Sequence, residues 1–162
     1  MAYFEIQEEI IKKYCVDICD GTKCKNDWSR THAHVKERRV CKWKRANSIQ
    51  STFTLLHEVG HIETTKSWMR RCESEYYATA WALERCREYG LKVPENLIQK
   101  YQKYIDREKD RGIRRGGTGY DELSLRKYMN RGRLEIDAPF LKAGAEYECG
   151  GGGVDVWVKV ES

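Results

Sequence analysis

The sequence predicts an α+β fold in which a small sheet is followed by helices. Apolar residues recur at helical spacing over 3–19, 48–63, 74–89 and 94–110. Residues 32–44 instead read as one or two strands, because their apolar residues include β-branched and aromatic ones. The chain has 162 residues, of which 40% are hydrophobic and 34% are charged, so it can bury one modest core.

The first helical segment is joined to the strand segment by a loop over 20–30, where Asp20-Gly21 and Asn26-Asp27 are typical turn dipeptides. The apolar stripe predicted for 3–19 contains Phe4, Ile11, Cys15, Ile18 and Cys19. The strand segment carries Val35, Val40, Cys41 and Trp43.

Each of the three later helices has a recognisable start or stop. Ser48 is the predicted N-cap of 48–63, and Ser74 that of 74–89, which Gly90 ends. Pro94 opens the helix 94–110. Because glycine costs a helix interior about 1 kcal/mol, Gly60 indicates that another backbone packs closely against it. A stripe of small residues on the following helix would permit such an approach: Ala78, Ala82 and Cys86.

We expect residues 1–110 to form the core and residues 111–162 to add a basic connector, a short helix at 120–129 and a C-terminal β segment at 154–160, packed on the core. No run approaches membrane-spanning length, and the N-terminus lacks a basic region followed by an apolar stretch. We therefore expect a cytoplasmic protein without a membrane partner. The odd number of cysteines, seven, agrees with thiols that remain reduced.

His57, Glu58 and His61 form the pattern HExxH inside the predicted helix 48–63. Residues four apart lie on one face of a helix, about 6 Å apart along its axis, so both imidazoles can face one Zn²⁺ with Glu58 beside them. Zinc lowers the pKa of water to about 7, and Glu58 could take the proton and pass it to a leaving amine. The amphipathic context argues against a chance match.

A catalytic zinc site needs a third protein ligand and leaves its fourth position to water. No histidine follows His61, since the other two histidines lie upstream. A carboxylate ligand is therefore favoured. The candidates on or near the next predicted helix are Glu73, Glu75 and Glu84.

Residues 53–61 read F-T-L-L-H-E-V-G-H, and residues 75–82 read E-Y-Y-A-T-A-W-A. These two blocks resemble the core of the ImmA/IrrE-like zinc metallopeptidases of phages, mobile elements and bacteria, T-L-x-H-E-x-G-H followed by E-x-x-A-N-x-F-A. Alignment of the second block on Ala78, Trp81 and Ala82 implies that Glu75, rather than Glu73, is the third ligand. Thr79 then takes the place of the family's Asn or Asp, where a residue that orients a ligand sits.

The resemblance implies a zinc-dependent endopeptidase in which His57, His61 and Glu75 hold Zn²⁺ and Glu58 is the general base. It implies a protein or peptide substrate, such as a repressor or another regulatory protein in a phage or mobile-element setting. The order of sheet and helices also suits a minimal zincin-like core, in which an edge strand near the zinc binds peptide by strand addition.

A second interpretation is a zinc-containing binding module with weak or no proteolysis that contacts nucleic acid or a protein partner. The net charge is +5, and Arg and Lys are dense at 36–45, 66–71 and 107–115. Such runs are usually solvated faces, and Asp and Glu are interspersed among them. Neither a helix-turn-helix pattern nor an RNA-binding aromatic signature occurs, so support for a nucleic-acid partner is weak.

One short segment is rich in further metal-binding residue types: Cys15, Cys19, Cys24, His32, His34 and Cys41. Four of these could surround a structural zinc, although the spacing lacks paired CxxC steps. Cys15 and Cys19 also fall on the predicted apolar stripe, where cysteine usually acts as a small hydrophobe. His32 and His34 alternate on a predicted strand and therefore face the same way, which suits a solvated or substrate-facing edge as well as ligation.

Overall fold

The computed structural model describes residues 1–20, 22, 24 and 30–117. It confirms the α+β class, because a small sheet and four helices are present in that part of the chain. The elements are α1 (Tyr3–Lys13), β1 (Asp17–Cys19), β2 (His32–His34), β3 (Arg39–Cys41), α2 (Ile49–Thr64), α3 (Arg71–Glu88) and α4 (Glu95–Arg114). None of these helices combines the length and the apolar composition that crossing a membrane requires. The predicted helix at 120–129 and the predicted strand at 154–160 lie outside the described residues.

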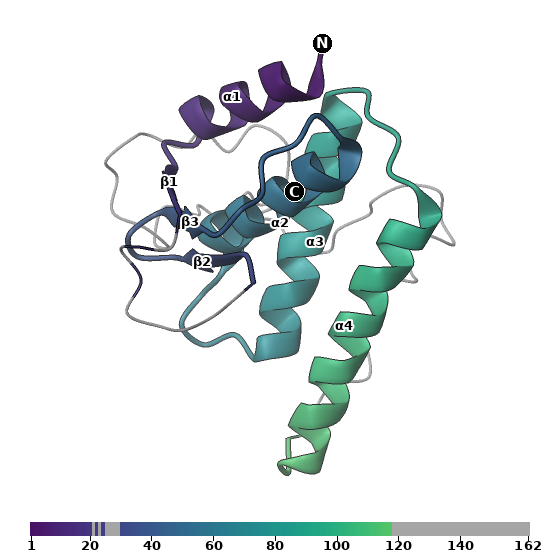
Figure 1. Cartoon of the computed structure of the whole chain (residues 1–162). Coiled ribbons are helices and arrows are strands. Elements are labelled where there is room, and N and C mark those ends of the chain that lie inside the picture. The colour runs from purple at the N-terminus through teal and green to yellow at the C-terminus, as the bar shows by residue number, and fades with distance from the viewer. Residues whose placement is uncertain (21, 23, 25–29, 118–162) are drawn as a thin grey trace, which may run out of the picture.

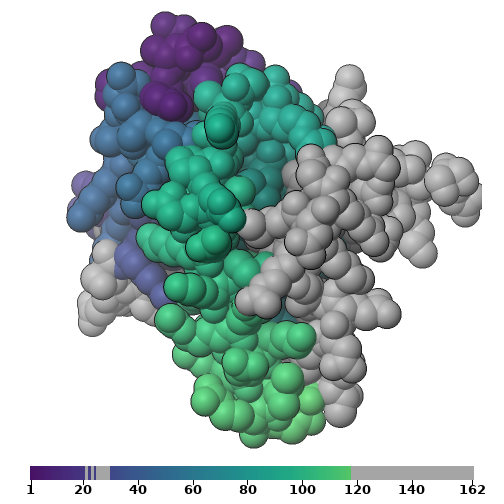
Figure 2. Space-filling view, turned by 90° about the vertical axis from the view of Figure 1, so that its right-hand side faces the viewer, coloured from purple at the N-terminus to yellow at the C-terminus, as the bar shows by residue number. Residues whose placement is uncertain are grey.

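β3 is the middle strand of the sheet, between β1 and β2. β1 runs parallel to β3 and places Ile18 opposite Val40, whereas β2 runs antiparallel and places Ala33 opposite Val40. The strand segment predicted over 32–44 is therefore a hairpin of two strands. The sheet lies beside α2, α3 packs against α2, and α4 packs on α3 (Figure 1). In the space-filling view α4 forms a long ridge on the surface (Figure 2).

The central helix, α2, begins where the sequence predicts. Oγ of Ser48 accepts a hydrogen bond from the backbone N–H of Ser51 at 3.1 Å, which satisfies one of the donors left open at a helix start. Its side chains pack with those of α1, β3 and α3 in one core, and burial of each large apolar side chain stabilises the fold by about 1.5–3 kcal/mol. The largest fully buried apolar side chains include Ile6, Ile10, Val40, Phe53, Leu55, Leu56, Val59, Ile62 and Trp81.

Gly60 confirms the predicted close approach of two backbones. A Cβ atom placed on Gly60 would lie 2.6 Å from the carbonyl oxygen of Ala78 and 3.0 Å from its Cα. Real Cβ atoms do not come so close to backbone atoms, so only glycine fits. The contact brings α2 and α3 together one residue before His61 and one helical turn after Glu75.

The first predicted helix is too long. Helical spacing predicts 3–19, but α1 ends at Lys13 and Cys15 adopts a left-handed φ of 52°. The chain then forms β1, whose first backbone N–H donates to the carbonyl of Arg38 at 2.9 Å. Strand pairing with a segment far away in the sequence outweighs a local helical pattern.

The predicted apolar stripe of this helix is wrong as well. Phe4 is 42% exposed, whereas Ile6 and Ile10 are buried and Gln7 lies between them. Gln7 can face the core because its side-chain amide donates to the carbonyl of Ala46 and to Oγ1 of Thr52, both at 2.9 Å.

Helices α3 and α4 are longer than predicted. α3 begins at Arg71, three residues before the predicted start at Ser74, so Ser74 lies inside the helix and is not its N-cap. Glu73, which the predicted start at Ser74 would place before the helix, lies in its first turn, and its carboxylate pairs with Arg70. α4 continues to Arg114, so the first four residues of the predicted connector are helical.

Candidate metal centre

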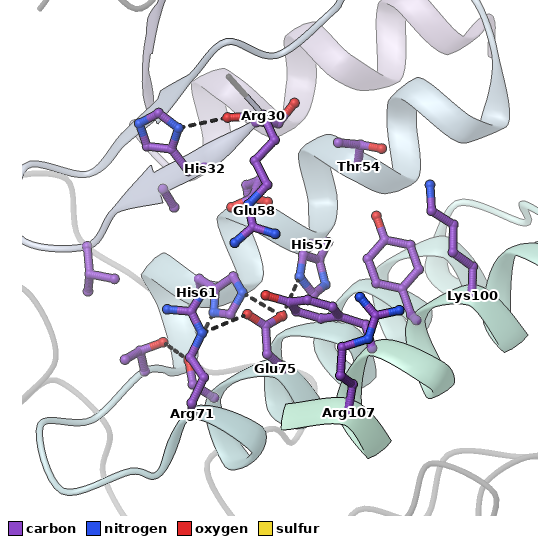
Figure 3. A pocket seen from close by; sticks show the side chains of 17 residues that line it. Arg30, His32, Thr54, His57, Glu58, His61, Arg71, Glu75, Lys100 and Arg107 are labelled. Atoms are coloured by element: carbon purple, nitrogen blue, oxygen red, sulfur yellow. Dashed lines mark hydrogen bonds and ion pairs between the residues drawn. The ribbon is translucent and has the colours of Figure 1, made fainter. Parts of the chain in front are cut away.

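Two neighbouring helices bring His57, His61 and Glu75 together. Oε2 of Glu75 lies 3.0 Å from Nε2 of His57 and 3.2 Å from Nε2 of His61 (Figure 3). All three residues contribute a ligand-type atom to one group that could hold a metal ion. Around a tetrahedral zinc with bonds of about 2.0–2.1 Å, such atoms stand about 3.3 Å apart, so the observed separations are close to those of a coordination site.

The charge balance of this group also favours a cation. Burial raises the pKa of the Glu75 carboxyl, but the charges and hydrogen bonds of His61 and His57 outweigh burial and hold that pKa well below its usual range. Burial lowers the pKa of His61, and Glu75 more than compensates, so this pKa is raised. The other carboxylate oxygen of Glu75 faces Nε of Arg71 at 3.5 Å.

Hydroxyl groups on α3 orient both imidazoles. The hydroxyl of Thr79 donates to the backbone carbonyl of Glu75 at 2.8 Å, so its oxygen is left to accept from Nδ1 of His57 at 3.2 Å. Oγ of Ser74 lies 3.0 Å from Nδ1 of His61 and 2.9 Å from Oγ1 of Thr65. In the neutral ring, a proton on Nδ1 leaves a lone pair on Nε2, as metal binding requires. Thr79 thus occupies the position expected of a residue that orients a ligand.

Glu58 is buried beside this group without belonging to it. Burial is the main cause that raises the pKa of its carboxyl, and Glu75 adds to that effect while His57 and His61 oppose it. A carboxyl group whose pKa is raised towards neutrality is suited to accept and return a proton.

A pocket of about 570 Å³ surrounds these residues. Its walls come from α2, from α3, from β2 with the residues just before it, and from α4, which the sequence had not placed at the site. Tyr101 of α4 packs against the ring of His57, with centroids 4.6 Å apart, and burial raises the pKa of its phenol to about 12. Four cationic side chains also line the pocket: Arg30, Arg71, Lys100 and Arg107.

Two aromatic residues of α4 that line the pocket belong to the apolar pattern that predicts the helix 94–110. Tyr101 and Tyr104 have helical spacing with Leu97, which is buried in the core, so their sequence pattern does not separate core from pocket. Only the tertiary position of α4 reveals their location.

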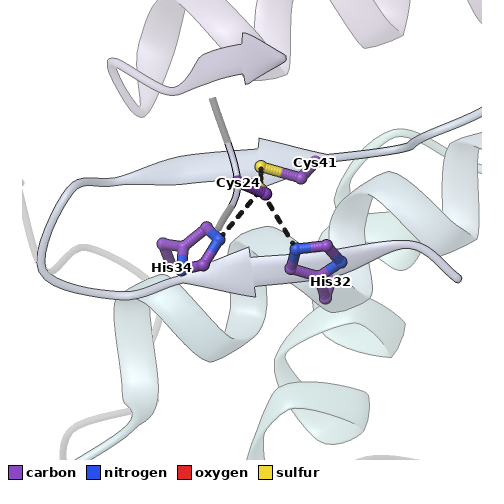
Figure 4. Close-up of side chains that lie close together, drawn as sticks. All are labelled: Cys24, His32, His34 and Cys41. Carbon is purple, nitrogen blue, oxygen red and sulfur yellow. Dashed lines mark hydrogen bonds between the residues drawn. The ribbon is translucent and has the colours of Figure 1, made fainter. Parts of the chain in front are cut away.

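The other predicted ligand candidates are not part of the HExxH group. Glu73 pairs with Arg70, and Oε2 of Glu84 lies 3.9 Å from Nη1 of Arg87. A second group that could hold a metal ion contains Cys24, His32, His34 and Cys41 (Figure 4). Cys15 and Cys19 are not members of it. Cys15 is disulfide-bonded, so the expectation that the thiols remain reduced is wrong for this residue.

Comparison with known proteins adds no relative, because no protein-family model, no curated protein and no solved structure matches this chain.

Proposed function

We propose that this chain is a zinc-dependent metalloendopeptidase that hydrolyses a protein substrate. The observation that carries the proposal is the convergence of His57, His61 and Glu75 on one point, with the buried carboxyl group of Glu58 in the same pocket. Two histidines and a carboxylate are a common ligand set of catalytic zinc, and they leave one position open. The ImmA/IrrE-like sequence blocks support the same function.

In the proposed reaction His57, His61 and Glu75 hold zinc, which, when bound, polarises the substrate carbonyl and makes water more acidic. Glu58 takes a proton from the attacking water as the water oxygen bonds to the carbonyl carbon. It then returns this proton to the amide nitrogen as the C–N bond breaks, so that the products are a carboxylic acid and an amine. Thr79 and Ser74 keep the imidazoles oriented throughout.

The sheet offers a place for an extended substrate. β2 is an edge strand among the described strands, and His32 and Ala33 from it line the pocket. A peptide that adds to this edge would run past Glu58 and the metal group, with its backbone held by strand hydrogen bonds. The four cationic side chains of the pocket favour a peptide with Asp or Glu near the cleaved bond. In line with the family resemblance, we propose a repressor or similar regulatory protein of a phage or mobile element as the substrate.

The same cations support the second candidate function, a zinc-containing module that binds nucleic acid with little proteolysis. Phosphate contacts make affinity fall steeply with salt. Binding to a DNA duplex whose affinity does not decrease between low and physiological salt would rule this candidate out.

The endopeptidase proposal is tested by Glu58→Gln and His57→Ala in a cleavage assay with unfolded protein substrates and a peptide library. We expect Glu58→Gln to keep zinc and lose cleavage, because the glutamine amide cannot accept the proton. We expect His57→Ala to lose both zinc and cleavage. Undiminished cleavage by Glu58→Gln would contradict the mechanism, and loss of zinc from it would make Glu58 a ligand or a structural residue.

A further inference from the structure

The second cluster joins three separate parts of the chain. Cys24 precedes β2, His32 and His34 are the ends of β2, and Cys41 ends β3. Sγ of Cys24 lies 3.3 Å from Nε2 of His32, 3.1 Å from Nε2 of His34 and 2.9 Å from Sγ of Cys41 (Figure 4). All four ligand-type atoms lie within 4.8 Å of one another.

The strand register accounts for this convergence. His32 and His34 are two apart on a strand, so their side chains leave the same face. Cys41 is directly opposite His32 in the antiparallel pair, which places its side chain on that face as well. Cys24 then reaches the cluster from the preceding segment and contacts all three of the others.

The orientation of His32 points to a ligand role. Its Nδ1 lies 2.9 Å from the backbone carbonyl of Arg30. A carbonyl oxygen can only accept, so Nδ1 carries a proton and, in the neutral ring, Nε2 directs a lone pair at Cys24. A histidine that donates its other N–H to a backbone carbonyl is the usual arrangement of a metal-binding histidine.

The distances fit a small tetrahedral ion. Ligand atoms of a zinc with two sulfur bonds of about 2.3 Å and two nitrogen bonds of about 2.0 Å stand about 3.5–3.7 Å apart. The two observed sulfur–nitrogen separations are about 0.2–0.4 Å shorter and the sulfur–sulfur separation is about 0.8 Å shorter, differences that side-chain rotations remove. None of Cys19, Cys24 and Cys41 forms a disulfide, so the sulfur atoms that crowd together here are thiols.

We propose that Cys24, His32, His34 and Cys41 bind a second zinc ion, separate from the HExxH group, that fastens β2 to β3 and to Cys24. Each strand of this sheet has only three residues, fewer than the usual length of about five or six, so few ladder hydrogen bonds support it. A structural zinc supplies that support because its binding free energy adds to the free energy of folding. Since His32 also lines the catalytic pocket, the ion holds the pocket wall that the substrate is expected to contact.

Metal content of variants tests the site. We expect two zinc ions per chain in the wild-type protein and one in Cys24→Ser and in His34→Asn after dialysis against a weak chelator. Cys19→Ser is the matched control, because Cys19 lies 2.8 Å from Cys41 but is not in the proposed ligand set. Cys86→Ser is a remote control on α3. Loss of zinc from Cys19→Ser together with full retention by Cys24→Ser would overturn the assignment.

Cobalt substitution keeps this test separate from the catalytic proposal. Thiolate ligands give bound Co²⁺ a strong charge-transfer absorption in the near ultraviolet, and the histidine–carboxylate group has no thiolate. We expect His57→Ala loaded with Co²⁺ to show this absorption, and Cys24→Ser/His57→Ala to lack it. If His57→Ala lacked this absorption, the proposal of a second zinc site would be wrong. If the absorption is present but His57→Ala binds as much metal as the wild type, only the catalytic proposal fails.

Discussion

Thr79 on α3 holds His57 on α2 through a hydrogen bond between its Oγ1 and Nδ1 of the ring, 3.2 Å apart. Because the Thr79 proton is directed at the carbonyl of Glu75, one hydroxyl fixes both the position of the Glu75 backbone and the tautomer of His57. This relationship explains how a threonine can serve at a position where the ImmA/IrrE-like pattern, which the sequence resembles, has Asn or Asp.

Replacement of Thr79 by valine should therefore weaken zinc binding. Valine has nearly the same shape but leaves Nδ1 of His57 without its acceptor, and residues that orient a ligand are worth about 10–100-fold in metal affinity. Competition with a chromophoric chelator measures the change. Thr79→Ser, which keeps the hydroxyl, should retain most of the affinity, and equal affinities of all three proteins would show that the hydrogen bond has no role.

The third ligand can be tested by comparing two glutamates on the same helix turn. Glu75→Ala should lose zinc from the HExxH group, because Glu75 is 3% exposed and its Oε2 contacts both imidazoles. Glu73→Ala should retain it, because Glu73 pairs with Arg70 and lies outside the group. Zinc analysis of both variants decides between the two glutamates. If Glu75→Ala retained zinc and Glu73→Ala lost it, Glu73 would be the third ligand.

The sequence predicted this part of the molecule well because its signals are local. Cap chemistry located the start of α2, and HExxH placed both histidines on one helix face. Gly60 indicated a close backbone contact in advance. Which carboxylate completes the group depends on how α2 and α3 pack, and the choice of Glu75 came from the family pattern, not from helix geometry.

Other parts depend on contacts between distant segments, which a local pattern does not contain. β1 forms because Asp17–Cys19 can pair with β3, although its apolar spacing is helical. The convergence of Cys24 with His34 and Cys41 depends on the register of the hairpin. The sequence spacing lacks CxxC steps, so it could not decide whether these residues form a metal site. The basic run at 107–115 was interpreted as a solvated face and Lys100 belonged to no such run, so only packing shows that Lys100 and Arg107 line the pocket.

Gly60→Ala should separate α2 from α3. The added methyl group would approach the backbone of Ala78 to 2.6 Å, and such overpacking costs about 1–3 kcal/mol, more than the roughly 1 kcal/mol that alanine gains in helix propensity. We expect lower stability in urea and weaker zinc binding together. Gln50→Ala, at an exposed position of the same helix, is the control, and a Gly60→Ala protein as stable as this control would contradict the close contact.

The cationic wall of the pocket should set substrate preference. Lys100→Gln and Arg107→Gln should each lower kcat/KM several-fold for a peptide with acidic residues beside the cleaved bond, because charge complementarity speeds association. Lys103→Gln, on the same helix but outside the pocket, should leave it unchanged. Equal effects of all three variants would mean that net charge, and not the pocket, attracts the substrate.

A buried ion pair between Arg38 and Glu63 should make stability depend on pH in a predictable way. Arg38 lies in the turn between β2 and β3, and it donates to Glu63 near the end of α2 and to the carbonyl of Tyr14 at 2.6 Å. Burial raises the pKa of the Glu63 carboxyl, and Arg38 opposes that effect. Arg38→Met would leave the buried carboxylate without its hydrogen-bonded partner and with only the charge of Arg85 to oppose burial, so the loss should approach the value of about 3–5 kcal/mol for a broken buried pair near neutral pH.

This cost should shrink as the pH falls. Without Arg38 the pKa of Glu63 in the folded protein rises further above its unfolded value, so the variant gains stability when Glu63 takes up a proton and loses it as the pH rises through that pKa. Urea unfolding of wild type and Arg38→Met at neutral and mildly acidic pH measures the difference. In Arg38→Met/Glu63→Gln the carboxylate is gone, so this pH dependence should vanish. If the destabilisation by Arg38→Met is the same at both pH values, the lost contact with Tyr14, and not the charge of Glu63, is its cause.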